Sequence, residues 1–221
     1  MHDEFRELGP LDRILSVLDQ GLKTLSGAAS APSAAARPTP RPETPAPAAP
    51  PTPAAVRESA GLMRVNHAGE VAAQALYHGQ ALIARDPAVR AYMLGAAREE
   101  GDHLVWCAER LRALGARPSR LDPLWYAGGV TIGALAGLGG DALSLGFITE
   151  TERQVEGHIN EHLERLPPED TASRAVLEQM RRDEIEHGAN ARARGAAELP
   201  LPLRRLMRLT AKVMTRSSYY F

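Results

Sequence analysis

Apolar residues recur at three- and four-residue steps along most of the chain, which is the pattern of amphipathic helices. No run alternates apolar and polar positions as a half-buried strand would. Glycine and proline pairs separate the periodic segments. The predicted helices span residues 8–26, 60–84, 88–114, 123–140, 142–165, 170–195 and 201–216. Long helices joined by short connections favour an all-α fold, an antiparallel up-and-down helix bundle.

The periodicity stops in residues 27–56, which are almost entirely Ala, Pro, Ser and Thr. Proline cannot donate a backbone hydrogen bond, and the stretch has too little apolar surface to offset the entropy of ordering. The sequence therefore predicts three parts. Residues 1–26 form an N-terminal amphipathic helix, residues 27–56 a disordered, partly extended linker, and residues 57–221 the folded domain.

The segment 123–140 carries no charge and is just long enough to be considered as a membrane span. It also contains six glycines, which are unfavourable in helix interiors. Gly129, Gly133 and Gly137 recur at every fourth position, and this spacing permits close approach of two helices. We therefore expect a buried or membrane-skimming helix rather than a span.

The C-terminal segment, residues 201–216, combines an apolar stripe with five basic residues. A basic amphipathic helix of this kind is typical of proteins that bind an anionic membrane surface or a partner groove. A helix that caps the bundle with a solvated basic face would show the same pattern. The N-terminal helix on its linker could be a second anchor or a docking peptide.

Composition excludes several classes of function. The formal net charge is −1, so no global charge recruits nucleic acid. A single cysteine, Cys107, excludes an internal disulfide and an all-cysteine zinc site. The acidic start resembles neither a secretory signal nor an arginine-rich transit peptide, so synthesis in a bacterial cytosol is the simplest expectation.

Two Glu-x-x-His pairs carry the candidate chemistry, Glu100–His103 and Glu184–His187. Residues i and i+3 share one helix face, so carboxylate and imidazole can bind one ion. Glu70 precedes the first pair by 30 residues and Glu152 precedes the second by 32, a distance that suits one helix, a turn and a return. Two helices giving one Glu and two giving Glu-x-x-His is the ligand set of ferritin-like di-iron proteins. Such ligands suit iron or manganese.

Acidic residues stand directly before both pairs, Glu99 and Asp183. Metal-bound histidines usually donate their free N–H to a carboxylate, which fixes the tautomer. We predict that role for Glu99 and Asp183, with His158 as a further partner near the metal site. The alternative is that these acids are solvated charges on exposed helix faces.

A competing motif lies at residues 158–162, which match the H-x-x-E-H string of inverted zinc peptidases. In that hydrolase His158 and His162 would bind zinc and Glu161 would act as general base. Both Glu-x-x-His pairs would then have no role. We instead expect His162 to be a solvated surface residue. Tyr77, beyond Glu70, could line a pocket or be an ordinary core aromatic.

The local motifs resemble those of demethoxyubiquinone hydroxylases over about residues 57–217. The similar strings are LMRVNHAGE at 62–70, YHGQ at 77–80, EGDHL at 100–104, PLW at 123–125 and DEIEH at 183–187. The resemblance implies six metal ligands: Glu70, Glu100, His103, Glu152, Glu184 and His187. Glu150 and Glu156 compete with Glu152, but His158 six residues later favours Glu152. Ile159 replaces a tyrosine that is usual in the family.

The resemblance also implies an activity. We expect a ferritin-like bundle with additional amphipathic, membrane-facing helices and two iron ions per chain. It would use O₂ and a two-electron reductant to hydroxylate a polyprenylated demethoxyubiquinol in ubiquinone biosynthesis. Expected partners are this substrate, the cytoplasmic face of the bacterial inner membrane, and a homo-oligomer or a ubiquinone-biosynthesis complex. No catalytic residue beyond the ligands is identified.

The apolar substrate needs a binding site with apolar walls. Residues 123–148 are the candidate for such a wall, with Trp125, Tyr126, Leu135, Leu138 and Phe147. A ferroxidase on the same bundle is the main rival, and a structural membrane-binding protein without iron is another. A ferroxidase needs a water-filled route for iron. The segment 123–140 carries no charge and so disfavours such a route.

Overall fold

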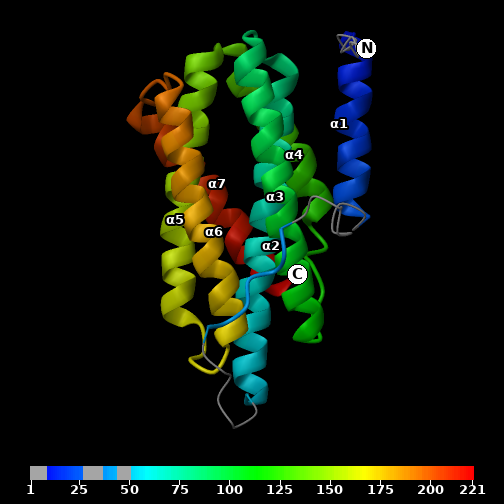
Figure 1. The fold of residues 1–221 in the computed structure, drawn as a ribbon, viewed down its shortest axis with the longest axis vertical. Helices are drawn as coiled ribbons and strands as arrows, with labels where there is room; N and C mark the ends of the chain where they lie inside the picture. The colour runs from blue at the N-terminus through cyan, green and yellow to red at the C-terminus, as the bar shows by residue number, and fades with distance from the viewer. Residues whose placement is uncertain (1–8, 27–36, 44–50) are drawn as a thin grey trace.

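The computed structural model describes residues 9–26, 37–43 and 51–221. Its helices, in chain order, are α1 Pro10–Leu25, α2 Pro53–Ile83, α3 Pro87–Ala113, α4 Asp122–Leu138, α5 Asp141–Arg165, α6 Thr171–Ala193 and α7 Leu201–Tyr220. These residues contain no strand, so the all-α prediction is confirmed. Figure 1 shows α2, α3, α5 and α6 side by side as long, nearly parallel rods, with α1 standing apart at the edge.

Helix α2 begins at Pro53, seven residues before the predicted start, so the last residues of the predicted linker are helical. Thr52 caps the helix, because its hydroxyl accepts a hydrogen bond from the amide of Ala55 at 3.2 Å. Pro53 suits the first helical position, where no N–H is needed. The predicted disorder of residues 27–36 and 44–50 concerns residues outside the described part of the chain.

Two apolar layers fill the bundle and leave a polar level between them. One layer contains Leu62 of α2, Leu111 of α3, Ile159 of α5 and Met180 of α6. The other contains Tyr77 and Ala81 of α2, Met93 of α3, Leu145 of α5 and Ala191 of α6. On each of the four helices the two layers are about two to four turns apart, and the predicted metal ligands lie in that gap. The core therefore encloses the candidate site on both sides.

Helix α4 packs against α2 through the glycines predicted to allow close approach. A Cβ added at Gly133 would lie 2.3 Å from the carbonyl oxygen of Leu76, and one at Gly129 would lie 2.8 Å from that of Ala72. A Cβ added at Gly79 of α2 would in turn lie 2.2 Å from the carbonyl oxygen of Val130. Among the described residues, no helix is both long and apolar enough to cross a membrane. The glycine repeat thus serves helix packing.

Gly133→Ala is expected to destabilise the protein by about 2 kcal/mol, because the added methyl group would force the two backbones apart. The unfolding temperature should fall by about 6 °C for a chain of this size. Gly128→Ala is the matched control, since a Cβ there meets nothing within 4 Å. It should be neutral or stabilising by up to about 1 kcal/mol, because alanine favours helix. Equal unfolding temperatures for the two variants in calorimetry would contradict this packing.

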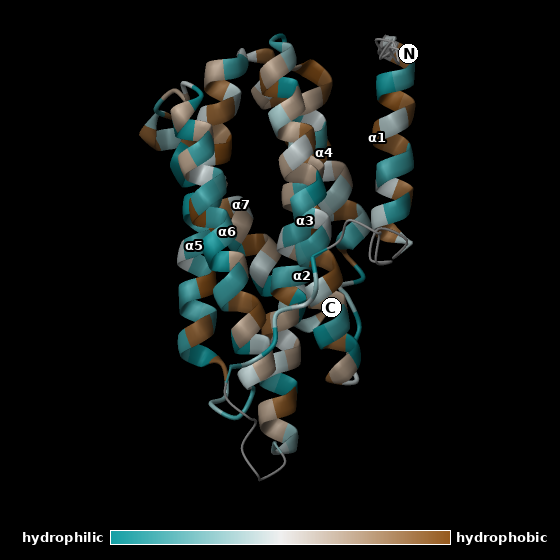
Figure 2. Cartoon of the chain, viewed as in Figure 1, coloured by the Kyte–Doolittle hydropathy of each residue, from teal (hydrophilic) through white to brown (hydrophobic). Residues whose placement is uncertain are grey.

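Figure 2 shows hydrophobic residues recurring along α1, which lies at the edge of the bundle. This apolar stripe is exposed. Leu11, Leu18 and Leu22 are 59–71% exposed. The contact with the bundle uses the other face, where the Thr24 hydroxyl donates to the Gln74 side-chain oxygen at 2.5 Å. The predicted amphipathic helix is therefore present, but its leucines stay exposed and do not pack on the other residues that the structure describes.

Candidate metal centre

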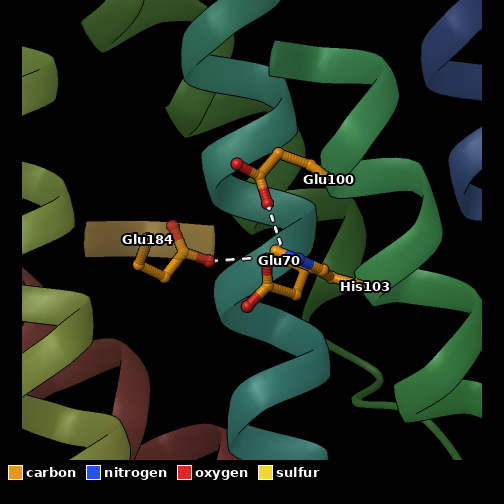
Figure 3. A group of neighbouring side chains, drawn as sticks. All are labelled: Glu70, Glu100, His103 and Glu184. Atoms are coloured by element: carbon orange, nitrogen blue, oxygen red, sulfur yellow. Dashed lines mark hydrogen bonds and ion pairs between the residues drawn. The ribbon is translucent and has the colours of Figure 1, made fainter. Parts of the chain in front are cut away.

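Six predicted ligands meet at the polar level between the two apolar layers. Glu70 comes from α2, Glu100 and His103 from α3, Glu152 from α5, and Glu184 and His187 from α6. All six are nearly inaccessible to solvent, with exposed fractions of 0–3%. Figure 3 shows Glu70, Glu100, His103 and Glu184 pointing toward one another from three helices. Burying this many acids is costly unless positive charge or hydrogen bonds balance them.

The six residues form two overlapping groups whose ligand atoms lie within 4.8 Å of one another. The first group is Glu70, Glu100, His103 and Glu184, and the second is Glu100, Glu152, Glu184 and His187. Glu100 and Glu184 belong to both. The arrangement is that of two adjacent metal positions with two shared carboxylates, consistent with a di-metal site.

Both histidines direct Nδ1 into the carboxylate cluster. His103 Nδ1 lies 3.0 Å from Glu100 Oε2 and 3.4 Å from Glu70 Oε2. His187 Nδ1 lies 3.2 Å from Glu100 Oε1. A close contact between an imidazole Nδ1 and a carboxylate oxygen requires a proton between the two atoms. Because carboxylates surround both Nδ1 atoms, a metal cation can take the place of that proton.

The opposite nitrogens contact the two acids singled out in the sequence, in a crossed arrangement. His103 Nε2 lies 2.9 Å from Asp183 of α6, and His187 Nε2 lies 2.8 Å from Glu99 of α3. Each acid thus pairs with the histidine of the other helix. A carboxylate at Nε2 holds the proton on that nitrogen and leaves Nδ1 free to bind a metal.

Electrostatics inside the cluster follow from its burial. Burial raises the pKa of Glu70 and of Glu152 well above the ordinary value, and the charge of Glu184 adds to both shifts. Burial also raises the pKa of Glu100, but hydrogen bonds with His103 and His187 outweigh it and bring that pKa below its ordinary value. Protons therefore balance part of the buried negative charge, as divalent cations also can.

A tyrosine contacts the ligand predicted on α5. The Tyr77 hydroxyl donates to Glu152 Oε1 at 2.5 Å, and both residues are buried. The sequence left open whether Tyr77 lines a pocket or only packs, and the structure gives it a polar contact with a cluster member. Glu150, the competitor of Glu152, instead bonds Arg153 at 2.6 Å and Arg204 at 3.3 Å.

The expectation that His162 is a solvated surface residue is wrong. It is 2% exposed, and its Nδ1 lies 2.9 Å from the Asn66 side-chain nitrogen. His158 packs on it with ring centroids 4.0 Å apart, and its Nε2 makes no hydrogen bond. His158 belongs to neither ligand group found among the described residues, and its role as a further partner near the metal site stays a prediction. The two histidines also lack a third ligand for the zinc site of a hydrolase within those residues.

His162 gives the protein a defined sensitivity to acid. Burial lowers its pKa to about 2. The unfolded chain takes up a proton below its ordinary pKa of about 6.5 and the folded chain does not, so stability is lost as pH falls below that value. The loss should be about 2 kcal/mol between pH 6.5 and pH 5 for this one residue. Urea unfolding of metal-free protein should show a shallower pH dependence in His162→Gln. An unchanged slope would contradict the assignment.

An open groove of about 1340 Å³ runs beside the cluster, between α2, α4, α5 and α7. Glu70 lies on its inner wall. Of the predicted wall residues, Trp125, Leu135 and Phe147 line it. Tyr126 does not, since its hydroxyl donates to the carbonyl oxygen of Val17 at 3.2 Å. Basic side chains border the groove, among them Arg165, Arg208, Lys212 and Arg216.

Comparison with known proteins places the chain in a family. Residues 57–218 match the family model described as ubiquinone biosynthesis protein COQ7. The chain belongs to the COQ7 family. A COQ7 relative from Burkholderia multivorans, named 3-demethoxyubiquinol 3-hydroxylase, is 56% identical over 95% of this chain and 99% of its own length. One from Ralstonia pickettii with the same name is 62% identical over 74% of this chain and 75% of its own.

A solved structure shares the fold. A dodecameric thioferritin from Bacteroides fragilis, related to bacterioferritin, covers 71% of this chain and 90% of its own at 16% identity, with a TM-score of 0.53. The likeness confirms the ferritin-like bundle and concerns the fold alone.

Proposed function

We propose that this COQ7-family chain is an enzyme, a di-iron monooxygenase that hydroxylates the ring of 3-demethoxyubiquinol in ubiquinone biosynthesis. The observation that carries the proposal is the pair of buried Glu/His groups sharing Glu100 and Glu184, in a chain 56% identical to a hydroxylase of that name over 95% of its length. The sequence resemblance and the side-chain geometry support the same activity.

The residues present fit two iron ions. Glu100 Oε1, Glu152 Oε2, Glu184 Oε1 and His187 Nδ1 are buried and make no hydrogen bond of good geometry with the described residues, although Glu100 Oε1 and His187 Nδ1 lie 3.2 Å apart. Buried polar atoms without a well-formed hydrogen bond are rare in proteins, and these four all face one cluster. Four carboxylates would neutralise two divalent ions, and mixed imidazole and carboxylate ligands suit iron.

In this assignment Glu70 and His103 would hold one ion, Glu152 and His187 would hold the other, and Glu100 and Glu184 would serve both. Iron bound there would supply the activation of O₂, with one oxygen atom going to the ring and the other leaving as water at the expense of two electrons from the reductant. Asp183 and Glu99 keep the histidine protons on Nε2, and Tyr77 restrains Glu152. The two apolar layers keep bulk water from the cluster.

The groove is the proposed substrate site. Its apolar walls on α4 and α5 suit a polyprenyl chain, and its contact with Glu70 would bring the ring beside the metal pair. The groove also borders the basic helix α7, which we propose rests on an anionic membrane, the cytoplasmic face of the bacterial inner membrane. A lipid-soluble substrate could then enter without crossing water.

The proposal is tested by supplying iron-loaded protein with a demethoxyubiquinol, a reductant and ¹⁸O₂. The expected product carries one added hydroxyl that contains ¹⁸O, detected by mass spectrometry. Iron oxidation without a hydroxylated product would favour the rival ferroxidase. Protein that retains no iron would favour a structural membrane-binding protein.

A further inference from the structure

Residues 37–43, expected to belong to a disordered linker, lie against α3 beside the metal centre. Figure 1 shows this short segment in blue, crossing the front of the bundle. Its contacts begin at Arg37, whose backbone carbonyl accepts a hydrogen bond from Trp106 Nε1 at 3.2 Å. Two residues on, the Thr39 hydroxyl donates to Glu109 Oε2 at 2.5 Å. The segment is therefore attached to α3 at two successive points.

The Arg37 guanidinium joins the two helices that supply the Glu-x-x-His pairs. Its Nε donates to Asp102 of α3 at 2.9 Å, and its NH1 donates to Asp183 of α6 at 2.9 Å. The same Asp183 oxygen lies 2.9 Å from His103 Nε2. Arg37 thus contacts a metal-ligand candidate through one intervening carboxylate, and its NH2 also lies 3.5 Å from His103 Nε2 itself.

The surroundings hold Arg37 in this position. Its guanidinium lies over the Trp106 ring, 4.8 Å from the centroid, and this ring packs against His103 at 5.2 Å. Asp102 and Asp183 have side chains only 14% and 11% exposed, so the ion pairs are partly shielded from water. Proline at positions 38, 40 and 42 restricts the backbone to extended conformations and lowers the entropy cost of docking.

The two halves of the centre differ in how firmly the carboxylate beside each histidine is held. The partner of His187, Glu99, has a side chain that is 56% exposed. The partner of His103 is covered by the linker and bound to an arginine. A carboxylate held by a fixed guanidinium keeps one orientation, whereas an exposed one exchanges its contact with water. The linker should therefore act on the His103 half and not on the His187 half.

We propose that residues 37–43 are part of the metal centre and that Arg37 is a positioning residue, which holds Asp183 against His103 Nε2 so that His103 Nδ1 faces its ion. The inference rests on the di-metal site of the proposed function but not on the hydroxylation reaction. It assigns to the linker a role in metal binding that its composition gives no sign of.

The test is titration of the metal-free, full-length protein with Co²⁺, followed by visible absorption, which reports on the ligands of each ion. Wild-type protein should bind two ions. Arg37→Gln should bind one of them roughly 10- to 100-fold more weakly, the usual cost of losing a partner of a ligating histidine. The weakened absorption should be the one lost in His103→Gln. Arg37→Lys should give an intermediate result, because an ammonium cannot span both aspartates as the guanidinium does.

Two matched variants separate this role from general stability. Arg41→Gln removes an exposed arginine from the same segment and should bind cobalt as wild type does. Glu99→Gln should weaken the other ion, the one assigned to His187. Wild-type affinities for both ions in Arg37→Gln, or equal weakening of both, would overturn the proposal. The titration uses neither substrate nor O₂, so a failure to find hydroxylation would leave the role of Arg37 intact. Wild-type protein that binds no pair of ions would overturn the metal centre as well as this role.

Discussion

Replacing Glu184 with alanine is expected to remove both iron ions and to abolish hydroxylation. Glu184 belongs to both ligand groups, so its loss deprives each ion of a carboxylate and leaves a buried gap beside two histidines. The effect should exceed the roughly 10- to 100-fold loss that follows removal of a ligand's hydrogen-bond partner. Iron content by metal analysis and product formation by mass spectrometry measure the two outcomes.

The control for this variant is Glu186→Ala, two residues further along α6 on the exposed side of the helix. It should retain the iron and the activity of wild type. Glu184→Ala protein that folds, keeps two iron ions and hydroxylates the substrate normally would show that the ligand assignment is wrong.

Replacing Arg205, Arg208 and Lys212 together with glutamine is expected to weaken binding to anionic lipid vesicles by roughly 10²-fold. These side chains of α7 are exposed, and each basic residue near an anionic surface contributes about 1 kcal/mol. The apolar residues Leu206 and Val213 on the same helix are also exposed, 58% and 57%. Vesicle co-sedimentation at low and high salt measures the loss.

The matched control replaces Arg98, Arg112 and Arg182, exposed residues of α3 and α6, with glutamine. It changes the net charge equally but should leave vesicle binding close to wild type, because the charges lie away from α7. Equal losses in the two triple variants would mean that overall charge, not α7, governs binding. The surface assigned to the membrane would then be wrong.

Helix positions were largely predictable because the apolar periodicity is a local property of the chain. The spacing of the Glu and His residues along the sequence also predicted most of the candidate metal ligands. Residues about 30 positions apart on antiparallel helices return to the same level of a bundle, which is how Glu70 and Glu100 meet. The crossed pairing of Glu99 with His187 was not predictable. Sequence spacing places Glu99 at the height of the metal site along the bundle, but it does not determine which histidine this carboxylate contacts.

Other features depended on distant contacts that local sequence does not encode. His162 is surrounded in sequence by Glu161, Glu164 and Arg165, which suggests a surface position, but its partner Asn66 lies 96 residues away. Arg37 bonds Asp183 across 146 residues, from a stretch whose composition is typical of disorder. The start of α2 was missed because proline and alanine also suit linkers. In each case a tertiary contact outweighed the local pattern.

We propose above all that six side chains from four helices bind two iron ions between the apolar layers. Anomalous diffraction from crystals of the iron-loaded protein, recorded at the iron absorption edge, tests it most directly. Two peaks are expected, one beside Glu70 and His103 and one beside Glu152 and His187, with Glu100 and Glu184 contacting both. Iron peaks elsewhere in the molecule, or a single peak that excludes Glu152 and His187, would contradict it.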